Sequence, residues 1–360
     1  MNCSRLRPRG LLLSCLAFGL WLGHGPSKLS ACTRVVYKGP NDTVLTGRSM
    51  DFSIEIPANL WVFPRGMERD GAAGGHTVTW TSKYGSLIAS SWDLGSSDGI
   101  NEKGLVANML WLVESGYPEF NPAGARPALS ISLWAQYVLD NFATVAEAVE
   151  ALKDEPFVVV TDLIPGTDKL TTTHLSVSDA GGDNAIFEYI GGELVIHHDP
   201  SHVVMTNDPP YEQQLAILGY WHNIPGQMFL PGTNRAADRF VRAHYYINAI
   251  PQTDDPRIAV AGVMSVVRNV SVPYGISTEG FPNLSTTRWR VVADQKRLVY
   301  YFENAITPNT FWVELERLDF APGAPVRKLK LDDNETYAGE TSAAFKESEP
   351  FEFQSVKPGS

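Results

Sequence analysis

The chain has 360 residues, a formal net charge of −11 at pH 7, and 44% hydrophobic and 11% aromatic residues. A chain this acidic is a poor partner for nucleic acid or for an anionic membrane surface, because like charges repel. Its length and aromatic content allow one large domain, or two modest ones, with a substantial hydrophobic core.

The first 31 residues have the layout of an export leader. Three arginines form a basic start, residues 11–22 form an apolar run, and Leu29-Ser30-Ala31 is a small-residue exit. Removing this signal peptide takes away four basic and no acidic side chains, so 329 residues with a net charge of −15 remain. The apolar run is too short to span a bilayer. We therefore expect a periplasmic or secreted protein with no membrane contact after leader cleavage.

Cys32 is the single cysteine that follows the leader, because Cys3 and Cys15 lie inside it. No intramolecular disulfide can then form, and a cysteine at a new N-terminus is either a reactive thiol or a lipid attachment point. A thiol beside a free α-amine is a self-contained catalytic unit, because an amine with a pKa of about 7.7 to 8.0 accepts the thiol proton near neutral pH. The alternative is a lipid-anchored, non-catalytic binding protein in which Cys32 is lipidated.

From Thr33 to Leu110 the sequence predicts short strands, each bounded by Gly, Pro, Asn or Asp. Turns at Gly39–Asp42 and Asn101–Gly104 predict two hairpins. The predicted strands are Arg34–Tyr37, Thr43–Arg48, Leu60–Phe63, His76–Thr81 and Leu105–Leu110.

Blocks of helices and strands alternate along the rest of the chain, which favours antiparallel sheets covered by helices over a βαβ arrangement. Thr144, with Glu147 three positions on, is the expected N-cap of a helix. The four strands between residues 171 and 206 are expected to form one meander. The predicted helices are Ser130–Leu139, Ala143–Leu152, Tyr211–Leu218, Ala236–Ile250 and Pro256–Val267, and the predicted strands are Thr171–Ser178, Ala185–Tyr189, Leu194–His197, Val203–Thr206, Thr287–Ala293 and Leu298–Phe302.

Arg48 and Asp51 stand three residues apart at the end of the strand that pairs back on the strand after Cys32. The hairpin is expected to bring both side chains close to the thiol. A guanidinium there favours the thiolate, and a carboxylate can hold the terminal amine and tune its basicity. An ordinary strand-end ion pair is the alternative interpretation.

Five stretches of sequence stand in order along the chain. They are Cys32-Thr33 as a mature start, Gly47-Arg48 with Asp51-Phe52, Asp98–Leu105, Met205–Pro210, and Leu230-Pro231-Gly232 followed by Asp238–Arg242. Together they resemble the choloylglycine hydrolase family, the penicillin V acylases and bile salt hydrolases, over nearly the whole chain after residue 31. The resemblance implies an α+β, four-layer αββα N-terminal-nucleophile fold with two stacked antiparallel sheets. We expect this domain over residues 32–320, and residues 321–360 as a surface-packed or partly disordered extension.

Position by position, the resemblance implies that Cys32 is the nucleophile and that Arg48 and Asp51 activate it. Asn207 is then an oxyanion donor, and Arg239 stabilises the charge network of the site. The alternatives are a plain turn before a helix for Asn207 and an ordinary surface helix residue for Arg239. The resemblance further implies a small linear amide as substrate, no metal and no organic cofactor, and a homo-oligomer, commonly a tetramer.

Trp111 is a departure from the family pattern. Gram-positive bile salt hydrolases carry Asn at this position and penicillin V acylases of that type carry Tyr. The backbone N–H of Trp111 can still serve an oxyanion hole, and its indole, with Met50, is predicted to bind substrate. An indole favours an aryl or fatty acyl group over conjugated bile acids, as in the exported Gram-negative branch, whose members cleave penicillin V and N-acyl homoserine lactones. A core Trp on a strand is the alternative.

Overall fold

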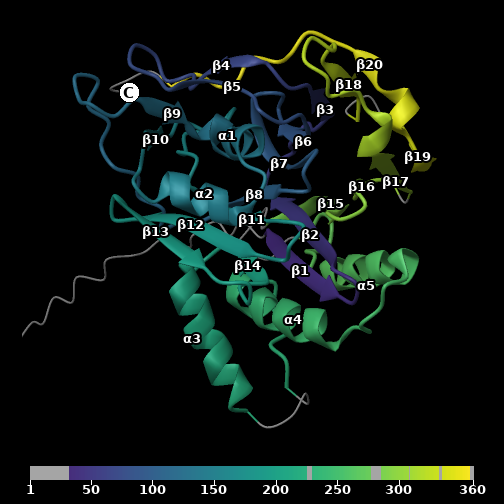
Figure 1. Ribbon diagram of the computed structural model, residues 1–360. Coiled ribbons are helices and arrows are strands. Elements are labelled where there is room, and N and C mark those ends of the chain that lie inside the picture. Colours follow the sequence, from purple (N-terminus) through teal and green to yellow (C-terminus); the bar gives the residue numbers. More distant parts are fainter. Residues whose placement is uncertain (1–31, 225–228, 277–284, 308, 332–334, 357–360) are drawn as a thin grey trace, which may run out of the picture.

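Two large sheets lie face to face in the computed structural model, which describes residues 32–224, 229–276, 285–307, 309–331 and 335–356. Helices α1 and α2 cover the outer face of one sheet, and helices α4 and α5 cover the outer face of the other (Figure 1). This confirms the four-layer αββα, α+β fold expected from the resemblance. The predicted leader, residues 1–31, lies outside the described residues.

The first sheet carries the strands nearest to Cys32. The hairpin at Gly39–Asp42 is confirmed, and Asn41 and Asp42 adopt positive φ angles of 54° and 55°, which these residue types tolerate in turns. The pairs in this sheet are antiparallel except for the last. Within the described residues its order is β14 (Val204–Thr206), β1 (Thr33–Gly39), β2 (Thr43–Phe52), β15 (Thr286–Asp294), β16 (Val299–Asn304), β17 (Thr310–Glu314) and β19 (Gly339–Glu340).

The predicted strand ranges did not include β6 and β7 of the second sheet, nor its tail strands β18 and β20. β6 and β7 consist largely of Ser, Gly and other small residues, which have low strand propensity, and the surrounding sheet imposes their conformation. The predicted hairpin at Asn101–Gly104 joins β7 to β8. In the described part of the chain this sheet runs β13 (Glu193–His198), β12 (Asn184–Ile190), β11 (Thr173–Ser178), β8 (Val106–Trp111), β7 (Gly95–Asn101), β6 (Ser86–Ser91), β3 (Leu60–Phe63), β18 (Arg327–Leu329) and β20 (Lys346–Glu347).

Strand β14 corrects the predicted meander. β11, β12 and β13 do form an antiparallel meander in the second sheet, but β14 crosses to the first sheet and pairs with β1. Thr206 lies opposite Thr33 in this ladder. The residue that follows β14 is therefore delivered beside the residue that precedes β1.

The helices agree with the predicted blocks, with shifted boundaries. Thr144 caps α2 as predicted, because its side chain accepts the backbone N–H of Glu147. The helix predicted from Ser130 begins instead with a 3-10 turn, for which Ser130 supplies the cap. The helices are α1 (Trp134–Asn141), α2 (Val145–Leu152), α3 (Tyr211–His222), α4 (Ala236–Ala249) and α5 (Pro256–Asn269), with 3-10 turns η1 (Ile131–Leu133), η2 (Leu315–Arg317) and η3 (Ser342–Ala344). None of the helices in the described ranges is long and apolar enough to cross a membrane.

Residues after 320 take part in both sheets. β19 pairs with β17 in the first sheet, and β18 pairs with β3 and β20 in the second. Two short pairs complete the strands, β4 (Glu68–Asp70) with β5 (Thr79–Thr81) and β9 (Ala128–Ser130) with β10 (Val158–Val160). The division at residue 320 stays a prediction. The described residues that follow it pack along both sheets.

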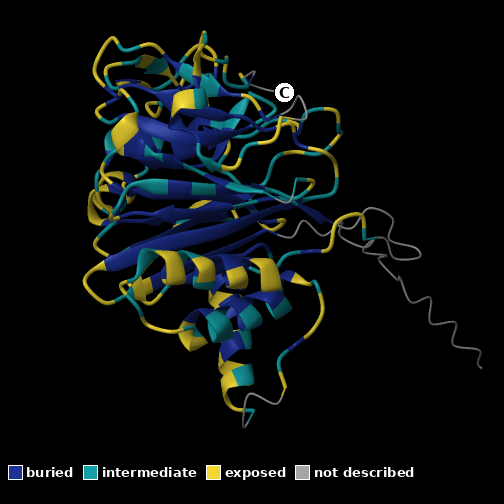
Figure 2. Ribbon diagram, turned by 90° about the vertical axis from the view of Figure 1, so that its right-hand side faces the viewer, coloured by how far each residue is buried: buried dark blue, intermediate teal, exposed yellow. Residues whose placement is uncertain are grey.

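Buried residues lie along the strands of both sheets and on the inner sides of the helices, while exposed residues mark the outer faces of the helices (Figure 2). Gly47 lies where α5 packs closely against the first sheet. A Cβ atom on Gly47 would lie 2.7 Å from Val263 Cγ1 and 2.8 Å from Val267 Cγ2. The strand that carries Arg48 and Asp51 is thus backed directly by a helix.

We expect Gly47→Ala to lower the free energy of unfolding by about 1–3 kcal/mol, because the added methyl group overpacks two buried valines. Urea unfolding followed by circular dichroism measures the change. Gly219→Ala is the matched control: no atom lies within 4 Å of its Cβ position, and alanine favours helix α3. Equal stability of the two variants would contradict the close packing of α5 on β2.

Candidate active site

The thiol of Cys32 is buried at the point where β1 begins. Its sulfur accepts the backbone N–H of Asp51 at 3.5 Å and lies 3.5 Å from the backbone oxygen of the same residue. Met50 Sδ is 3.7 Å away and Arg48 Nη2 is 4.0 Å away. The β1–β2 ladder therefore brings Arg48, Met50 and Asp51 around the sulfur, as the hairpin predicted.

The guanidinium of Arg48 is fully buried and is held from several sides. Nη1 donates to Asp98 Oδ2 at 2.8 Å, and Nη2 donates to the backbone oxygen of Met109 at 3.1 Å. The Arg48 guanidinium also stands 5.6 Å over the ring of Trp289. The second oxygen of Asp98 accepts a hydrogen bond from the Tyr300 hydroxyl. These contacts fix Arg48 towards the sulfur, so it is not the surface ion pair that the alternative required.

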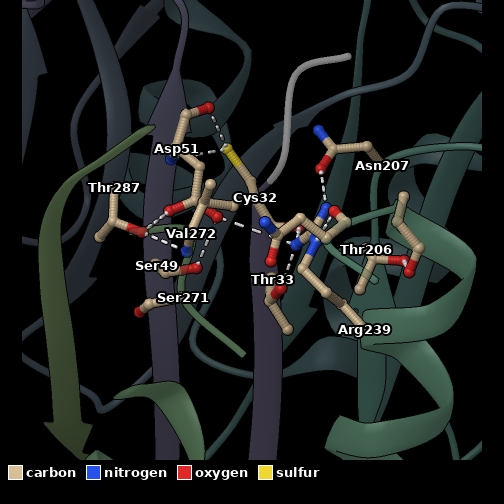
Figure 3. A network of polar contacts seen from close by, with 12 residues as sticks. Cys32, Thr33, Ser49, Asp51, Thr206, Asn207, Arg239, Ser271, Val272 and Thr287 are labelled. Atoms are coloured by element: carbon tan, nitrogen blue, oxygen red, sulfur yellow. Dashed lines mark hydrogen bonds and ion pairs between the residues drawn. The ribbon is translucent and has the colours of Figure 1, made fainter. Parts of the chain in front are cut away.

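Asp51 is held by neutral donors on one side and by a cation on the other (Figure 3). Ser49 donates to Oδ2 at 3.1 Å, and the Thr287 hydroxyl donates to Oδ1. Arg239 Nη1 lies 3.8 Å from Oδ2. The carboxylate is fully buried, so its position relative to Cys32 is set by β2 and β15 together.

Arg239 reaches into the site from the first turns of α4 (Figure 3). Nη1 donates to the backbone oxygen of Cys32 at 2.7 Å and also to the Thr33 hydroxyl. Nη2 donates to Asn207 Oδ1 at 3.1 Å, and Nε donates to the backbone oxygen of Asn234 at 3.1 Å. Arg239 is buried and bound at every nitrogen, which rules out the surface helix interpretation.

Asn207 follows β14 directly and is placed beside Cys32 by the β14–β1 ladder. With Oδ1 held by Arg239, its Nδ2 faces the other way and donates to the backbone oxygen of Trp111 at 2.8 Å. An amide nitrogen carries two hydrogens, so one remains after this contact. Gln214 of α3 also holds the turn, because its amide donates to the Asn207 carbonyl at 3.1 Å and to the Pro209 carbonyl at 2.6 Å.

The backbone N–H of Trp111 points to the same side as Asn207. Thr173 lies opposite Trp111 in the β8–β11 pair. Its N–H donates to the Tyr117 hydroxyl, and that hydroxyl donates to the Thr173 carbonyl. In an antiparallel strand the N–H and C=O of one residue face the same side. Because the Trp111 carbonyl accepts Asn207, its N–H is directed to that side as well.

Charge and burial oppose each other in this site. Burial raises the pKa of the Cys32 thiol, and Arg48 is the main group that opposes the rise. Burial likewise raises the pKa of Asp51, against the lowering effect of Arg239 and the hydroxyls of Thr287 and Ser49. Burial also raises the pKa of Asp98, which Arg48 opposes.

An apolar cavity of about 130 Å³ opens from Cys32. Phe52 stands between two indoles, with ring centroids 6.2 Å from Trp92 and 6.3 Å from Trp111. Trp111 and Met50 both line the cavity, so the indole belongs to the cavity wall and not to the closed core. No charged side chain is among the described residues that line it.

Several groups of the site were not assigned from the sequence. Asp98 belongs to the Asp98–Leu105 stretch, but the sequence analysis gave its side chain no role. A lone acid among small residues of a strand is nevertheless a signal for a buried ion pair. Phe52 follows Asp51 in another of the five stretches but was not predicted to line the cavity. Nothing in the sequence pointed to a role for Trp92 or Thr287 in the site. Within the described ranges, no group of three or more His, Cys, Asp or Glu side chains is placed to hold a metal ion.

Comparison with known proteins gives consistent matches. The model of the linear amide C–N hydrolases, choloylglycine hydrolase family, matches residues 32–335. Penicillin V acylase of Pectobacterium atrosepticum is 48% identical over 374 residues, which cover 98% of both chains. Bile salt hydrolase/transferase of Clostridium perfringens is 25% identical over 75% of this chain and 88% of its own. The solved structure of penicillin V acylase from Agrobacterium tumefaciens is 54% identical, with a TM-score of 0.83 over 89% of this chain and 99% of that chain.

We expect Arg48→Gln to raise the pKa of the Cys32 thiol further, because a cation near the sulfur favours the thiolate. The midpoint of the pH dependence of alkylation by iodoacetamide, followed by intact mass, should shift upward. Arg257→Gln, an exposed arginine of α5, is the control and should leave the midpoint unchanged. An unshifted midpoint in folded Arg48→Gln protein would show that the charge of Arg48 does not affect the pKa of the Cys32 thiol.

Proposed function

The chain belongs to the choloylglycine hydrolase family of linear amide C–N hydrolases, and we propose that it hydrolyses linear amides through a thioester on Cys32. Penicillin V and N-acyl homoserine lactones are the proposed substrates of first choice, and conjugated bile acids come next. The observation that carries the proposal is the position of a single thiol between Arg48 and Asp51 at the inner end of an aromatic cavity.

The proposed reaction begins after residues 1–31 are removed and Cys32 has a free α-amine. The amine accepts the thiol proton, and the thiolate attacks the amide carbon. The tetrahedral intermediate collapses, the leaving amine takes the proton, and the acyl group stays on sulfur. Water activated by the α-amine then hydrolyses the thioester. Arg48 favours the thiolate, and Asp51 orients the terminal amine.

The oxyanion of each tetrahedral intermediate is proposed to accept from Asn207 Nδ2 and from the backbone N–H of Trp111. Their shared orientation supports this assignment. Arg239 fixes the direction of the amide, because its guanidinium occupies Oδ1 and leaves Nδ2 for the substrate side. Donors held in place in advance lower the barrier without reorganisation during the reaction.

The cavity wall supports an apolar acyl group. Phe52, Trp92 and Trp111 suit the phenoxy group of penicillin V, and an uncharged lining also suits a fatty acyl chain. The name of the Pectobacterium relative, penicillin V acylase, supports the first of these. Export to the periplasm and assembly into a tetramer remain parts of the proposal.

A lipid-anchored binding protein is the rival function. A lipid on the sulfur needs a thiol that reaches out of the fold, whereas Cys32 is 2% exposed and lies among buried charged groups. Burying an Arg or an Asp carries a desolvation cost that a simple anchor does not require. The buried charges therefore favour the enzyme.

We expect Cys32→Ala to abolish hydrolysis of penicillin V and acyl homoserine lactones while the thermal melting temperature stays close to that of the wild type. Product release by the purified protein, measured in parallel on penicillin V, an acyl homoserine lactone and a glycine-conjugated bile acid, tests both the nucleophile and the substrate class. The intact mass of the wild-type protein should correspond to an unmodified chain that begins at Cys32. A diacylglyceryl mass, or turnover that survives in Cys32→Ala, would refute the proposal.

We expect Asn207→Ala to lower kcat by about 10²–10³, because removal of one oxyanion donor typically has this effect. KM should change much less, since the donor acts on charge that develops in the transition state. Asn223→Ala, an exposed asparagine at the end of α3, is the control and should retain wild-type kcat. A loss confined to KM would point to a binding role for Asn207 instead.

A further inference from the structure

We infer that Gln354 is a specificity-determining residue that closes the outer end of the acyl cavity and limits the length of the acyl group. Gln354 lies in the described tail, residues 335–356, most of which follows the stretch that the family model matches. The inference rests on the proposed function, because it assigns the cavity to the acyl group.

The tail returns across the outside of the second sheet. In Figure 1 it runs, in yellow, from β20 across β4 and β5 towards its end near β9. Phe351 and Phe353 anchor it, because their rings lie 5.8 Å and 6.4 Å from the ring of Phe63. Val356 N–H then donates to the Ala72 carbonyl at 2.8 Å. The segment around Gln354 is therefore held on both sides.

The backbone of Gln354 joins two segments of the cavity wall. Its N–H donates to the Leu94 carbonyl at 2.8 Å. Its carbonyl accepts the hydroxyls of Ser130 at 2.8 Å and Ser132 at 3.1 Å. These bonds use main-chain atoms, so they are kept when the side chain is replaced.

The side chain of Gln354 reaches a third segment. Nε2 donates to the Leu163 carbonyl at 2.9 Å, and the next two residues, Ile164 and Pro165, line the cavity with Gln354 itself. Gln354 is half-buried, so its amide stands where the cavity meets solvent. The glutamine thus spans the outer end of an otherwise mainly apolar cavity.

The sulfur and Gln354 occupy different layers of the fold. Cys32 sits on the first sheet, whereas Gln354 contacts Ser130 and Ser132 just before α1, outside the second sheet. Both residues line the same cavity. An acyl group bound to the sulfur therefore extends from Cys32 towards Gln354, and the length of the cavity is set by the side chain at position 354.

The test compares hydrolysis of N-acyl homoserine lactones with acyl chains of about four to twelve carbons by wild type, Gln354→Ala and Gln354→Trp. A buried methylene contributes about 0.8 kcal/mol, or roughly fourfold in kcat/KM. Gln354→Ala should raise kcat/KM about fifteenfold for chains two carbons longer than the wild-type optimum and leave shorter chains within about twofold. Gln354→Trp should shift the optimum to shorter chains.

Ser355→Ala is the matched control, since Ser355 is exposed on the same segment and does not line the cavity. Its chain-length profile should match wild type. If Gln354→Ala or Gln354→Trp changes kcat/KM by one factor at every chain length, Gln354 does not limit acyl length and the inference fails while the proposed function stands. If the wild type cleaves none of these lactones, penicillin V or a glycine-conjugated bile acid, the proposed function fails. Should Gln354→Ala not fold, the direction of the Gln354→Trp shift decides.

Discussion

Strand β1 hydrogen-bonds to β2 along one edge and to β14 along the other. Because β1 begins at the residue after Cys32, this double pairing sets the sulfur between Asp51 on one side and Asn207 on the other. Arg239 adds a contact from outside the sheet, on the Cys32 carbonyl. Arg48, Asp51, Asn207 and Arg239 are therefore positioned around the residues at the start of β1. A shift of register in either ladder would move Asp51 or Asn207 away from the sulfur.

The buried charges of the site balance. Arg48 faces Asp98, Arg239 faces Asp51, and none of the four side chains is exposed. Single buried ions are costly in a low dielectric, while paired and hydrogen-bonded ions are tolerated. Transfer of the thiol proton to a neutral amine creates one anion and one cation together, so the proposed activation step leaves the net charge of this buried region unchanged.

Two kinds of site residue could be predicted from the sequence: those close to Cys32 along the chain, and those that belong to motifs of the family. Arg48 and Asp51 lie one hairpin away from Cys32, so turn signals alone brought them near the thiol. Asn207 and Arg239 were assigned only through family resemblance, because the β14–β1 ladder joins distant segments and no periodicity reveals it; the meander prediction placed β14 in the wrong sheet. The partners of Asp98 and the strands β6 and β7 depend on packing between sheets, which residue patterns do not encode.

The groups assigned to the reaction and the outer wall of the cavity come from different parts of the chain. The former lie at the start of β1, on β2, just after β14, at the end of β8 and on α4, whereas the latter comes from the turn at Leu94, the segment at Ile164 and the tail at Gln354. Gln354 joins these outer segments, because its N–H donates to the Leu94 carbonyl and its side-chain amide donates to the Leu163 carbonyl. A substitution in these outer segments can therefore alter selectivity for the acyl group without displacing the residues assigned to the reaction.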